Sequence, residues 1–331
     1  MMLTALSGPI PRELGNLQSL TVLGMGTSNF SGSIPEEFGN MTSLQQWYMD
    51  SSGLSGELPE TLSKITNMQI LWASDNAFTG NIPDYIGNSW TSMTELRFQG
   101  NSFQGPIPSN LANLVKLTSL RIGDVTNGSR STLDIISNMT SLSTLILRNC
   151  KISDSLPNNF VQFKSLQKLD LSFNNITGQL PQSLFSLSTL KYLFLGNNSL
   201  TGSLPSGKSS SLLNIDLSYN ELSGSLPSWV NQDTNLQLNL MANNFVIDSS
   251  NSSNLPFGLK CLQRDISCHR DNPRYSSFAI KCGGAKTITA QDGTVYQPDN
   301  ANLSAATYYP YSYRCNLMGG KQRGSIFRSI Q

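Results

Sequence analysis

The sequence predicts a solenoid of stacked short repeats, with a parallel β-sheet along its concave face. Nine times along the chain a small residue, usually Gly, is followed two positions later by Ile or Leu and then by Pro. Most of these motifs are about 24 residues apart, a spacing typical of repeat architectures. The prolines are Pro11, Pro35, Pro59, Pro83, Pro108, Pro157, Pro181, Pro205 and Pro227. Because repeats stack one on another, a chain of 331 residues does not need two separate cores.

A leucine pattern precedes most of these prolines and defines the repeat. In Leu166-x-x-Leu169-x-Leu171-x-x-Asn174-x-Ile176, Leu169 and Leu171 alternate as in a short strand, which sends one face into the stack and the other outward. This is the leucine-rich-repeat signature. We therefore expect about ten strands, the last near residues 236–240.

An Asn follows the last apolar strand position by three residues in six repeats. A buried amide at this position can bond backbone groups of its own turn and of the neighbouring turn, so we expect a ladder of side-chain amides. Cys150 occupies the same position in its repeat and is expected to be structural and reduced. The six residues are Asn76, Asn101, Asn174, Asn198, Asn220 and Asn243.

One repeat departs from the pattern. Between Pro108 and Pro157 there are two repeat lengths, and the intervening copy is poor. It begins as Leu117-x-x-Leu120-x-Ile122 but lacks the Asn, the Gly and the Pro that should follow. We therefore expect a distorted loop at residues 123–129.

The composition argues against several classes of protein. The formal net charge is +1 and 13% of the residues are charged, so no nucleic-acid-binding surface is expected. No run of about 18 apolar residues occurs, so no membrane span is expected. Residues 1–6 lack a basic region and a long apolar stretch, so we identify no signal peptide. His269 is the only histidine, which argues against a histidine-based metal site, and no cofactor is expected.

Two strings imitate catalytic motifs without their structural context. Residues 202–209 match the phosphate-binding P-loop pattern, but a strand at 212–217, rather than a helix, is expected to follow. His269-Arg270-Asp271 imitates a kinase catalytic loop, but the Asn expected five residues later is Ser276. We therefore expect neither nucleotide binding nor enzymatic activity.

Both ends of a solenoid expose apolar surface and need caps. Cys261 and Cys268 follow the last repeat and are well placed to form a disulfide in a C-terminal cap; the alternative is two free thiols. The chain opens halfway through a repeat, at residues 6–11, so an N-terminal cap is expected to be missing.

The chain contains eight sequons for N-glycosylation, about as many as its Asn, Ser and Thr content gives by chance. Those within repeats fall on outward positions, because the ladder asparagines are followed by apolar residues. If the chain is secreted, glycans would leave only the bare faces for a partner. The sequons are at Asn29, Asn40, Asn127, Asn138, Asn175, Asn197, Asn251 and Asn302.

The outward position in the middle of each strand is predicted to line the concave face. Two aromatic residues and two arginines follow one another there, and we name Tyr48, Trp72, Arg97 and Arg121 the concave stripe. Such residues are frequent binding anchors, so we predict the concave stripe and the nearby Arg148 as ligand-binding residues. The alternative is a stack that stiffens the sheet, with Arg97 and Arg121 solvated or paired with Glu95 and Asp124. In order, the position carries Gly24, Tyr48, Trp72, Arg97, Arg121, Ile146, Asp170, Phe194 and Asp216.

Several stretches resemble the ectodomain of plant leucine-rich-repeat malectin receptor-like serine/threonine kinases. The Leu-x-Gly-x-Ile-Pro form of the repeat is similar to the plant extracellular subclass, and the strings at 48–53, 72–76 and 96–103 resemble that family more closely. The strings at 261–264, 278–284, 292–296 and 306–309 resemble its junction with a malectin-like domain. From Cys315 onward the resemblance ends.

The resemblance implies an α/β-repeat solenoid at 1–245, a C-terminal cap at 246–271 and an incomplete all-β malectin-like segment at 272–331, which we expect to be poorly ordered from Asn272. It implies extracellular recognition of a peptide, protein or cell-wall glycan, with a possible co-receptor kinase. We expect the chain itself to lack a kinase and to be a truncated ectodomain. The alternatives are a repeat protein that inhibits a wall-degrading enzyme, or a decoy without signalling. Replacing Trp72 and Arg97 with Ala is expected to weaken partner binding without lowering thermal stability.

Overall fold

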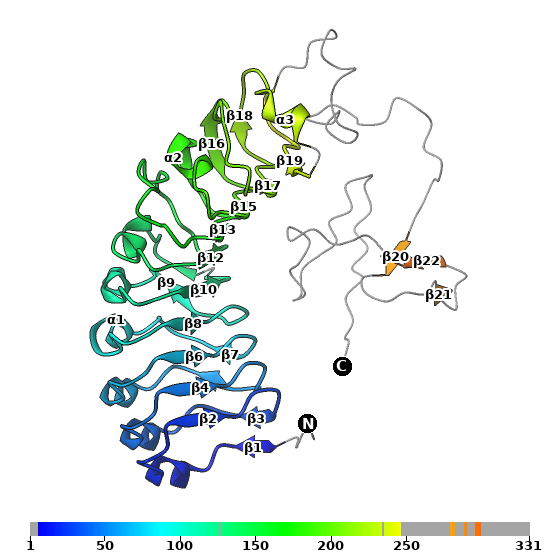
Figure 1. The fold of residues 1–331 in the computed structure, drawn as a ribbon. Helices are drawn as coiled ribbons and strands as arrows, with labels where there is room; N and C mark the ends of the chain where they lie inside the picture. The colour runs from blue at the N-terminus through cyan, green and yellow to red at the C-terminus, as the bar shows by residue number, and fades with distance from the viewer. Residues whose placement is uncertain are drawn as a thin grey trace.

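A ten-stranded parallel sheet lines the concave side of a curved solenoid in the computed structural model (Figure 1). The structure describes residues 6–125, 127–233 and 235–245, and three short strands farther along the chain. The sheet follows chain order, so the predicted fold class and the number of strands are confirmed. Its strands are β2 (Val22–Gly24), β4 (Gln46–Tyr48), β6 (Ile70–Trp72), β8 (Glu95–Arg97), β10 (Ser119–Gly123), β12 (Thr144–Arg148), β13 (Lys168–Asp170), β15 (Tyr192–Phe194), β17 (Asn214–Asp216) and β19 (Gln237–Asn239).

Short helical turns form the opposite, convex side (Figure 1). Most start directly after a repeat Pro; Pro35, for example, has extended backbone angles (φ −63°, ψ 142°) and ends the segment that leads into the turn. The 3₁₀ helices are Arg12–Asn16, Glu36–Asn40, Glu60–Lys64, Ser109–Asn113 and Leu133–Ile136. The α-helical turns are α1 (Tyr85–Ser89), α2 (Gln182–Phe185) and α3 (Trp229–Gln232).

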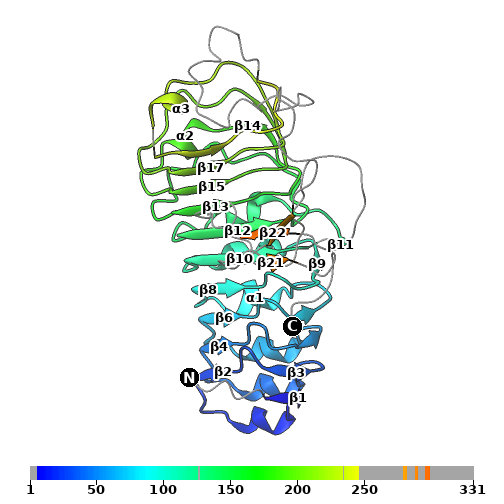
Figure 2. The ribbon, with the colours of Figure 1, turned by 90° about the vertical axis from the view of Figure 1, so that its right-hand side faces the viewer.

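A second layer of shorter parallel strands lies beside the large sheet (Figure 2). It consists of separate groups, β1 with β3, β5 with β7, β9 with β11, and β14 with β16 and β18. The repeat glycines at this level often have positive φ, as at Gly178 (φ 80°), a conformation that a side chain would strain. The strands are β1 (Ser7–Pro9), β3 (Asn29–Ser31), β5 (Ser55–Gly56), β7 (Ala77–Phe78), β9 (Gln104–Gly105), β11 (Asn127–Gly128), β14 (Thr177–Gln179), β16 (Ser199–Gly202) and β18 (Glu221–Leu222).

The core lies between the large sheet and the helical turns and is built from columns of equivalent side chains. One column consists of the central inward leucines of six consecutive strands, which are paired in register and at most 1% exposed. Burial of such a side chain stabilises the fold by about 1.5–3 kcal/mol. The leucines are Leu71, Leu96, Leu120, Leu145, Leu169 and Leu193.

The predicted ladder of asparagines is confirmed at all six positions. The Asn174 amide oxygen accepts hydrogen bonds from the backbone N–H groups of Cys150 (2.9 Å) and Ile152 (3.0 Å) in the preceding repeat. Its amide nitrogen donates to the carbonyls of Leu147 (2.7 Å) and Leu171 (2.9 Å). Each amide therefore ties two repeats together with bonds that water cannot replace in the core.

The ladder is interrupted where β10 and β12 meet. Val125 and Cys150 occupy two successive Asn positions, and both are fully buried. The Cys150 thiol is free, as the sequence predicts, and donates to the carbonyls of Arg148 (3.3 Å) and Ile122 (3.5 Å). β10 and β12 pair over five residues, whereas their neighbours contribute three, so backbone hydrogen bonds add connections where the amides are missing.

The distorted loop expected at residues 123–129 is a wrong prediction for the described part of that segment. β11 pairs with β9 in register and continues the layer of short strands. The hydroxyl of Ser131 then accepts a hydrogen bond from the backbone N–H of Ile107 (2.9 Å). Backbone pairing maintains the repeat geometry here although the consensus residues are absent.

Near the C-terminus the structure describes β20 (Ala279–Lys281), β21 (Ile288–Thr289) and β22 (Val295–Pro298), in the order β20-β22-β21. The predicted cap at 246–271, its Cys261–Cys268 disulfide and the His269 string lie outside the described residues, as does the segment from Asn272, expected to be poorly ordered, apart from these three strands. The malectin-like assignment stays a prediction. Among the helices that the structure describes, none is long and apolar enough to cross a membrane.

Candidate ligand-binding surface

The sheet places the residues of the concave stripe side by side. Tyr48 pairs in register with Trp72, Trp72 with Arg97, and Arg97 with Arg121. Neighbouring strands are about 4.8 Å apart, so these side chains stand next to one another on the same face. The predicted register of this outward position is confirmed from Gly24 to Asp216; its role in binding stays a prediction.

Tyr48, Trp72 and Arg97 form a packed, partly exposed cluster. The rings of Tyr48 and Trp72 meet edge to face, with centroids 4.8 Å apart and an interplanar angle of 84°. The Arg97 guanidinium carbon lies 3.6 Å from the centroid of the Trp72 ring. Each of these contacts contributes about 0.5–1.5 kcal/mol in proteins, so the free protein already holds the three side chains in one arrangement.

Glu95 organises this cluster from the same strand as Arg97. One of its carboxylate oxygens accepts hydrogen bonds from the Trp72 indole N–H (3.0 Å) and from the Arg97 guanidinium (3.1 Å). Glu95 and Arg97 are two residues apart on a strand and therefore share a face. The Arg97–Glu95 pair, which the alternative interpretation of the stripe allowed, is thus present, and the Arg97 Nε–H stays buried without a hydrogen-bond partner among the described residues.

Arg121 has a different environment from the one expected. Its Nε donates to the hydroxyl of Ser119 (3.4 Å), whereas Asp124 accepts a hydrogen bond from the Asn149 amide (2.9 Å). The Arg121–Asp124 pair that the alternative interpretation allowed is therefore not formed, because Asp124 has a left-handed backbone (φ 60°) and bonds to the next repeat. Burial and the neighbouring Arg97 lower the pKa of Arg121.

Asp50 lies on the outward side of the turn after β4 and contributes negative charge near the concave stripe. It accepts a hydrogen bond from the Ser74 backbone N–H (2.6 Å). Burial raises its pKa, while Arg97 and Arg121 act in the opposite direction. The only signal for Asp50 in the sequence is its outward position two residues after Tyr48.

Arg148 belongs to a second cluster, which lies on β12 in the C-terminal half of the large sheet. Its guanidinium donates to the Ser172 hydroxyl (2.9 Å) and lies 4.0 Å from the centroid of the Phe173 ring. Phe173 is 44% exposed and has positive φ (60°), which is uncommon for a bulky residue. The structure therefore does not bring Arg148 together with Trp72, and Phe173 is an exposed aromatic residue beside Arg148 that no sequence pattern indicates.

Three outward residues in the middle of the sheet are buried. Ile146, Asp170 and Phe194 are at most 3% exposed, although their positions match those of Tyr48 and Trp72. One Asp170 oxygen accepts hydrogen bonds from the Ser172 N–H and hydroxyl, and the other has no partner among the described residues. Burial raises the pKa of Asp170, against the effect of Arg148 and Lys168.

The sequons within the described residues are all on exposed asparagines, so their side chains are accessible to a modifying enzyme. Glycosylation itself stays a prediction, and Asn251 and Asn302 lie outside the described residues. The described sequons are those of Asn29, Asn40, Asn127, Asn138, Asn175 and Asn197.

The P-loop-like string has a structural role in the solenoid. The Lys208 ammonium is almost completely buried and forms an ion pair with Asp233 (2.6 Å). It also donates to the carbonyls of Ser209 and Leu212. β17, rather than a helix, follows the string. Lys208 is thus engaged within the fold and is not held out toward a phosphate.

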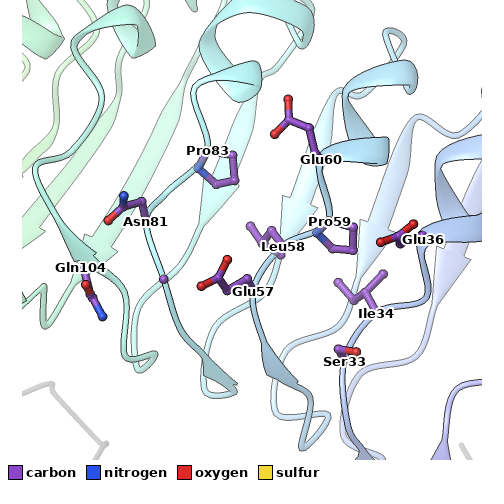
Figure 3. A pocket seen from close by; sticks show the side chains of 11 residues that line it. Ser33, Ile34, Glu36, Glu57, Leu58, Pro59, Glu60, Asn81, Pro83 and Gln104 are labelled. Carbon is purple, nitrogen blue, oxygen red and sulfur yellow. The ribbon is translucent and has the colours of Figure 1, made fainter.

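A shallow depression away from the large sheet crosses the repeats that contain Pro35, Pro59 and Pro83 (Figure 3). Glu36, Glu57 and Glu60 line it, and no residue of the concave stripe does. The acidic lining distinguishes this side of the N-terminal repeats from the concave face.

Comparison with known proteins agrees with this architecture. One leucine-rich-repeat family model matches residues 140–200, and a second leucine-rich-repeat model matches residues 92–114 and 211–232. Two probable leucine-rich-repeat receptor-like serine/threonine-protein kinases of Arabidopsis thaliana are 47% and 48% identical to this chain over 74 residues. The matched segment is 22% of this chain and 7% of each kinase.

Solved plant receptor structures resemble most of the described chain. The plant peptide hormone receptor RGFR1, in complex with RGF2, has a TM-score of 0.66 and 32% identity over 72% of this chain and 38% of that one. The Arabidopsis receptor kinase HAESA, in complex with the peptide hormone IDA and the co-receptor SERK1, has a TM-score of 0.62 and 31% identity over 72% of this chain and 40% of that one. This chain therefore spans less than half the length of these relatives. It is a leucine-rich-repeat solenoid homologous to plant leucine-rich-repeat receptor-like serine/threonine kinases.

Proposed function

We propose that this chain is the ligand-recognition module of a plant cell-surface receptor, and that it binds a peptide ligand on its concave face. The preformed cluster of Tyr48, Trp72 and Arg97 is the observation that carries this proposal. A ligand that meets side chains already held in place loses less conformational entropy on binding than one that must order them. Aromatic residues and arginine also dominate the energetics of protein interfaces.

A peptide is favoured over other ligands because two of the similar receptor ectodomains were solved with peptide hormones, RGF2 and IDA. The HAESA complex also contains the co-receptor SERK1, which supports a co-receptor kinase as a second partner here. In this proposal the module acts on the extracellular side of the plasma membrane. Signalling belongs to a serine/threonine kinase in the intact receptor, as the names of the curated relatives suggest.

The test is a binding screen of the purified chain, with synthetic candidates for plant secreted peptides immobilised and affinities measured by biolayer interferometry. Each hit is measured again with Trp72→Ala/Arg97→Ala. We expect its affinity to fall at least tenfold, or about 1.4 kcal/mol. A matched control is Val115→Ala/Lys116→Ala, which changes two exposed residues away from the large sheet.

Trp72 packs against both Tyr48 and Arg97, so a third variant separates binding from packing. Trp72→Phe keeps an aromatic ring and removes the indole N–H that bonds Glu95. Its melting temperature should stay close to that of the parent, so an affinity loss in this variant cannot come from unfolding. Hits that bind the double Ala variant as tightly as the parent would place the binding site outside the concave stripe.

A further inference from the structure

Three consecutive turns at the edge of the concave face, those after β13, β15 and β17, carry Phe173, Asn197 and Tyr219 (strands labelled in Figure 1). Each residue follows the last residue of its strand by three positions, and the strands are paired in register. The N–H of Phe173 donates to the carbonyl of Gly196 (2.9 Å), and the N–H of Asn197 donates to that of Ser218 (2.8 Å). The turns are therefore in register as well, with Asn197 between the two aromatic residues.

The two aromatic residues are unusual at this position of the turn, which has positive φ in every one of these repeats. Asn, Asp and Gly adopt such a conformation most readily, and bulky residues rarely do. Phe173 (φ 60°) is nevertheless 44% exposed and Tyr219 (φ 54°) is 37% exposed. Their backbone strain is not offset by burial of the rings in the core, which indicates that the rings serve a surface contact. The other residues at this position are Thr27, Ser51, Asp75, Gly100, Asp124, Asn149 and Ala242.

The Phe173 ring is held from one side. The Arg148 guanidinium carbon lies 4.0 Å from the ring centroid and so packs on one of its two faces. Arg148 belongs to the repeat before Phe173, whereas Asn197 belongs to the repeat after it. The opposite face of the ring is therefore directed toward Asn197.

Asn197 is exposed and begins the sequon Asn197-Asn198-Ser199. The next residue, Asn198, is a ladder asparagine whose amide bonds two backbone carbonyls of the core, so Asn197 stands on a fixed turn. Neighbouring strands are about 4.8 Å apart, so the turns that carry Phe173 and Tyr219 are roughly 10 Å apart. Because carbon atoms in contact are about 4 Å apart, one sugar ring attached to Asn197 fits between the two side chains.

We propose that Phe173 and Tyr219 form a carbohydrate subsite for the chain's own N-linked glycan, whose first N-acetylglucosamine, on Asn197, packs between the two rings. The C–H groups on the face of a sugar ring are apolar and weakly positive, and the face of an aromatic ring is weakly negative, so the two surfaces are complementary. The proposal goes beyond the proposed function. It shares with it only the extracellular location, which takes the chain through the compartment where glycans are attached.

A glycan held in this way would be a fixed part of the surface. It would cover the turns of the C-terminal half, because β15 lies between β13 and β17. β15 is four strands from β8, or roughly 19 Å along the sheet. The glycan would thus close one edge of the C-terminal half and leave Tyr48, Trp72 and Arg97 accessible.

The test measures how fast endoglycosidase H trims each glycan of the native full chain, which is secreted behind an added signal peptide from cells that make only high-mannose glycans. Peptide mass spectrometry gives the occupancy and the trimming rate at each sequon. Asn175 is the matched control, because it is exposed and the equivalent residues of the adjacent repeats are Lys151 and Ser199, neither of them aromatic. We expect trimming at Asn197 to be at least fivefold slower than at Asn175, and the two rates to be equal after denaturation.

The variant Phe173→Ala/Tyr219→Ala separates the two rings from other causes of slow trimming. It should raise the rate at Asn197 to that at Asn175 and leave the rate at Asn175 unchanged. Val161→Ala, which changes a 62%-exposed apolar residue outside the strands of the large sheet, should alter neither rate. Circular dichroism of each variant checks that the solenoid is folded.

Three outcomes would overturn the subsite: an Asn197 without glycan, trimming at Asn197 as fast as at Asn175 in the parent, or slow trimming that persists in the double Ala variant. None of these outcomes depends on a peptide ligand. Failure of the peptide screen with slow, ring-dependent trimming at Asn197 would count against the receptor function alone, and the reverse result would count against the subsite alone.

Discussion

At the outward middle position of their strands, β4, β6 and β8 carry Tyr48, Trp72 and Arg97, whereas β12, β13 and β15 carry Ile146, Asp170 and Phe194. The first three are partly exposed, and the last three are buried. The two sets occupy equivalent positions of one repeat, in register across one sheet. The repeat therefore fixes where a side chain stands, and the neighbouring strands fix whether it is accessible and what charge surrounds it.

The two halves meet where the consensus is weakest. Val125 and Cys150 replace the ladder asparagines there, and β10 and β12 pair over five residues. Arg121 lies on β10 at this junction, between the aromatic residues of the N-terminal half and the buried residues of the C-terminal half. Tyr48, Trp72 and Arg97 thus lie on one side of a structural boundary and Arg148 on the other, and the halves can be compared by mutation.

The largest effect is expected from breaking the ladder that both halves share. Asn174→Ala leaves the backbone N–H groups of Cys150 and Ile152 buried without their acceptor, and should cost about 3 kcal/mol of unfolding free energy. Asn101→Ala in the N-terminal half should cost a similar amount, because Asn101 is buried and its amide bonds Phe78, Ala73 and Phe98. Urea unfolding followed by circular dichroism measures both.

The matched control is Asn175→Ala, next to Asn174 in the chain. Asn175 is exposed and has one side-chain hydrogen bond, to the Ser153 hydroxyl (3.2 Å), so its loss should cost less than about 0.5 kcal/mol. If the losses of unfolding free energy in Asn101→Ala and Asn174→Ala differed by more than a factor of two, the two halves would differ in stability as well as in their concave faces.

A smaller effect is expected from Asp170→Asn, in the C-terminal half, on the pH dependence of stability. Burial raises the pKa of Asp170, so the folded state holds a proton that the unfolded state has released above about pH 4. The carboxyl therefore lowers stability as the pH rises from about 4 toward neutral. The melting temperature of the parent should fall more between pH 5 and pH 7 than that of Asp170→Asn.

Asp50 and Asp75 also have raised pKa values and remain in this variant. The pH dependence of the melting temperature should therefore become smaller in Asp170→Asn but not disappear. Glu13 and Asp233 have lowered pKa values, and their contribution is lost only as the pH falls below about 4. Identical slopes of melting temperature against pH for the parent and Asp170→Asn between pH 5 and pH 7 would show that the burial of Asp170, with one oxygen lacking a partner among the described residues, does not raise its pKa enough to distinguish this half.

The repeat architecture could be predicted almost completely from the sequence. The spacing of Leu, Asn and Pro predicts the strand positions, the ladder and the turns, because each of these residues has the same structural role in nearly every repeat. The distorted loop predicted at residues 123–129 was wrong, because backbone pairing between β9 and β11 compensates for the missing consensus residues. Such pairing does not depend on particular side chains, so the sequence does not reveal it.

The candidate site could be predicted only in part. Alternation along the strands placed Tyr48, Trp72 and Arg97 on one face and suggested Glu95 as a partner. It could not show that Arg121 bonds Ser119 or that Arg148 stacks on Phe173, because both depend on side-chain geometry between strands. Nor could it show that Ile146, Asp170 and Phe194 are buried.

The smallest effect on stability is expected from substitution of Cys150, which lies at the junction between the halves. Burial raises the pKa of its thiol, and the thiolate is the form that reacts with alkylating reagents. In native buffer Cys150 should therefore resist iodoacetamide, and labelling, mapped by peptide mass spectrometry, should rise only with the urea unfolding transition. Cys150→Ser keeps a donor for the Ile122 and Arg148 carbonyls and should cost no more than about 1 kcal/mol. Labelling in native buffer at the rate of a free thiol would instead show that β10 and β12 separate locally. The five-residue pairing would then not compensate for the interrupted ladder, and the two halves of the concave face would move independently.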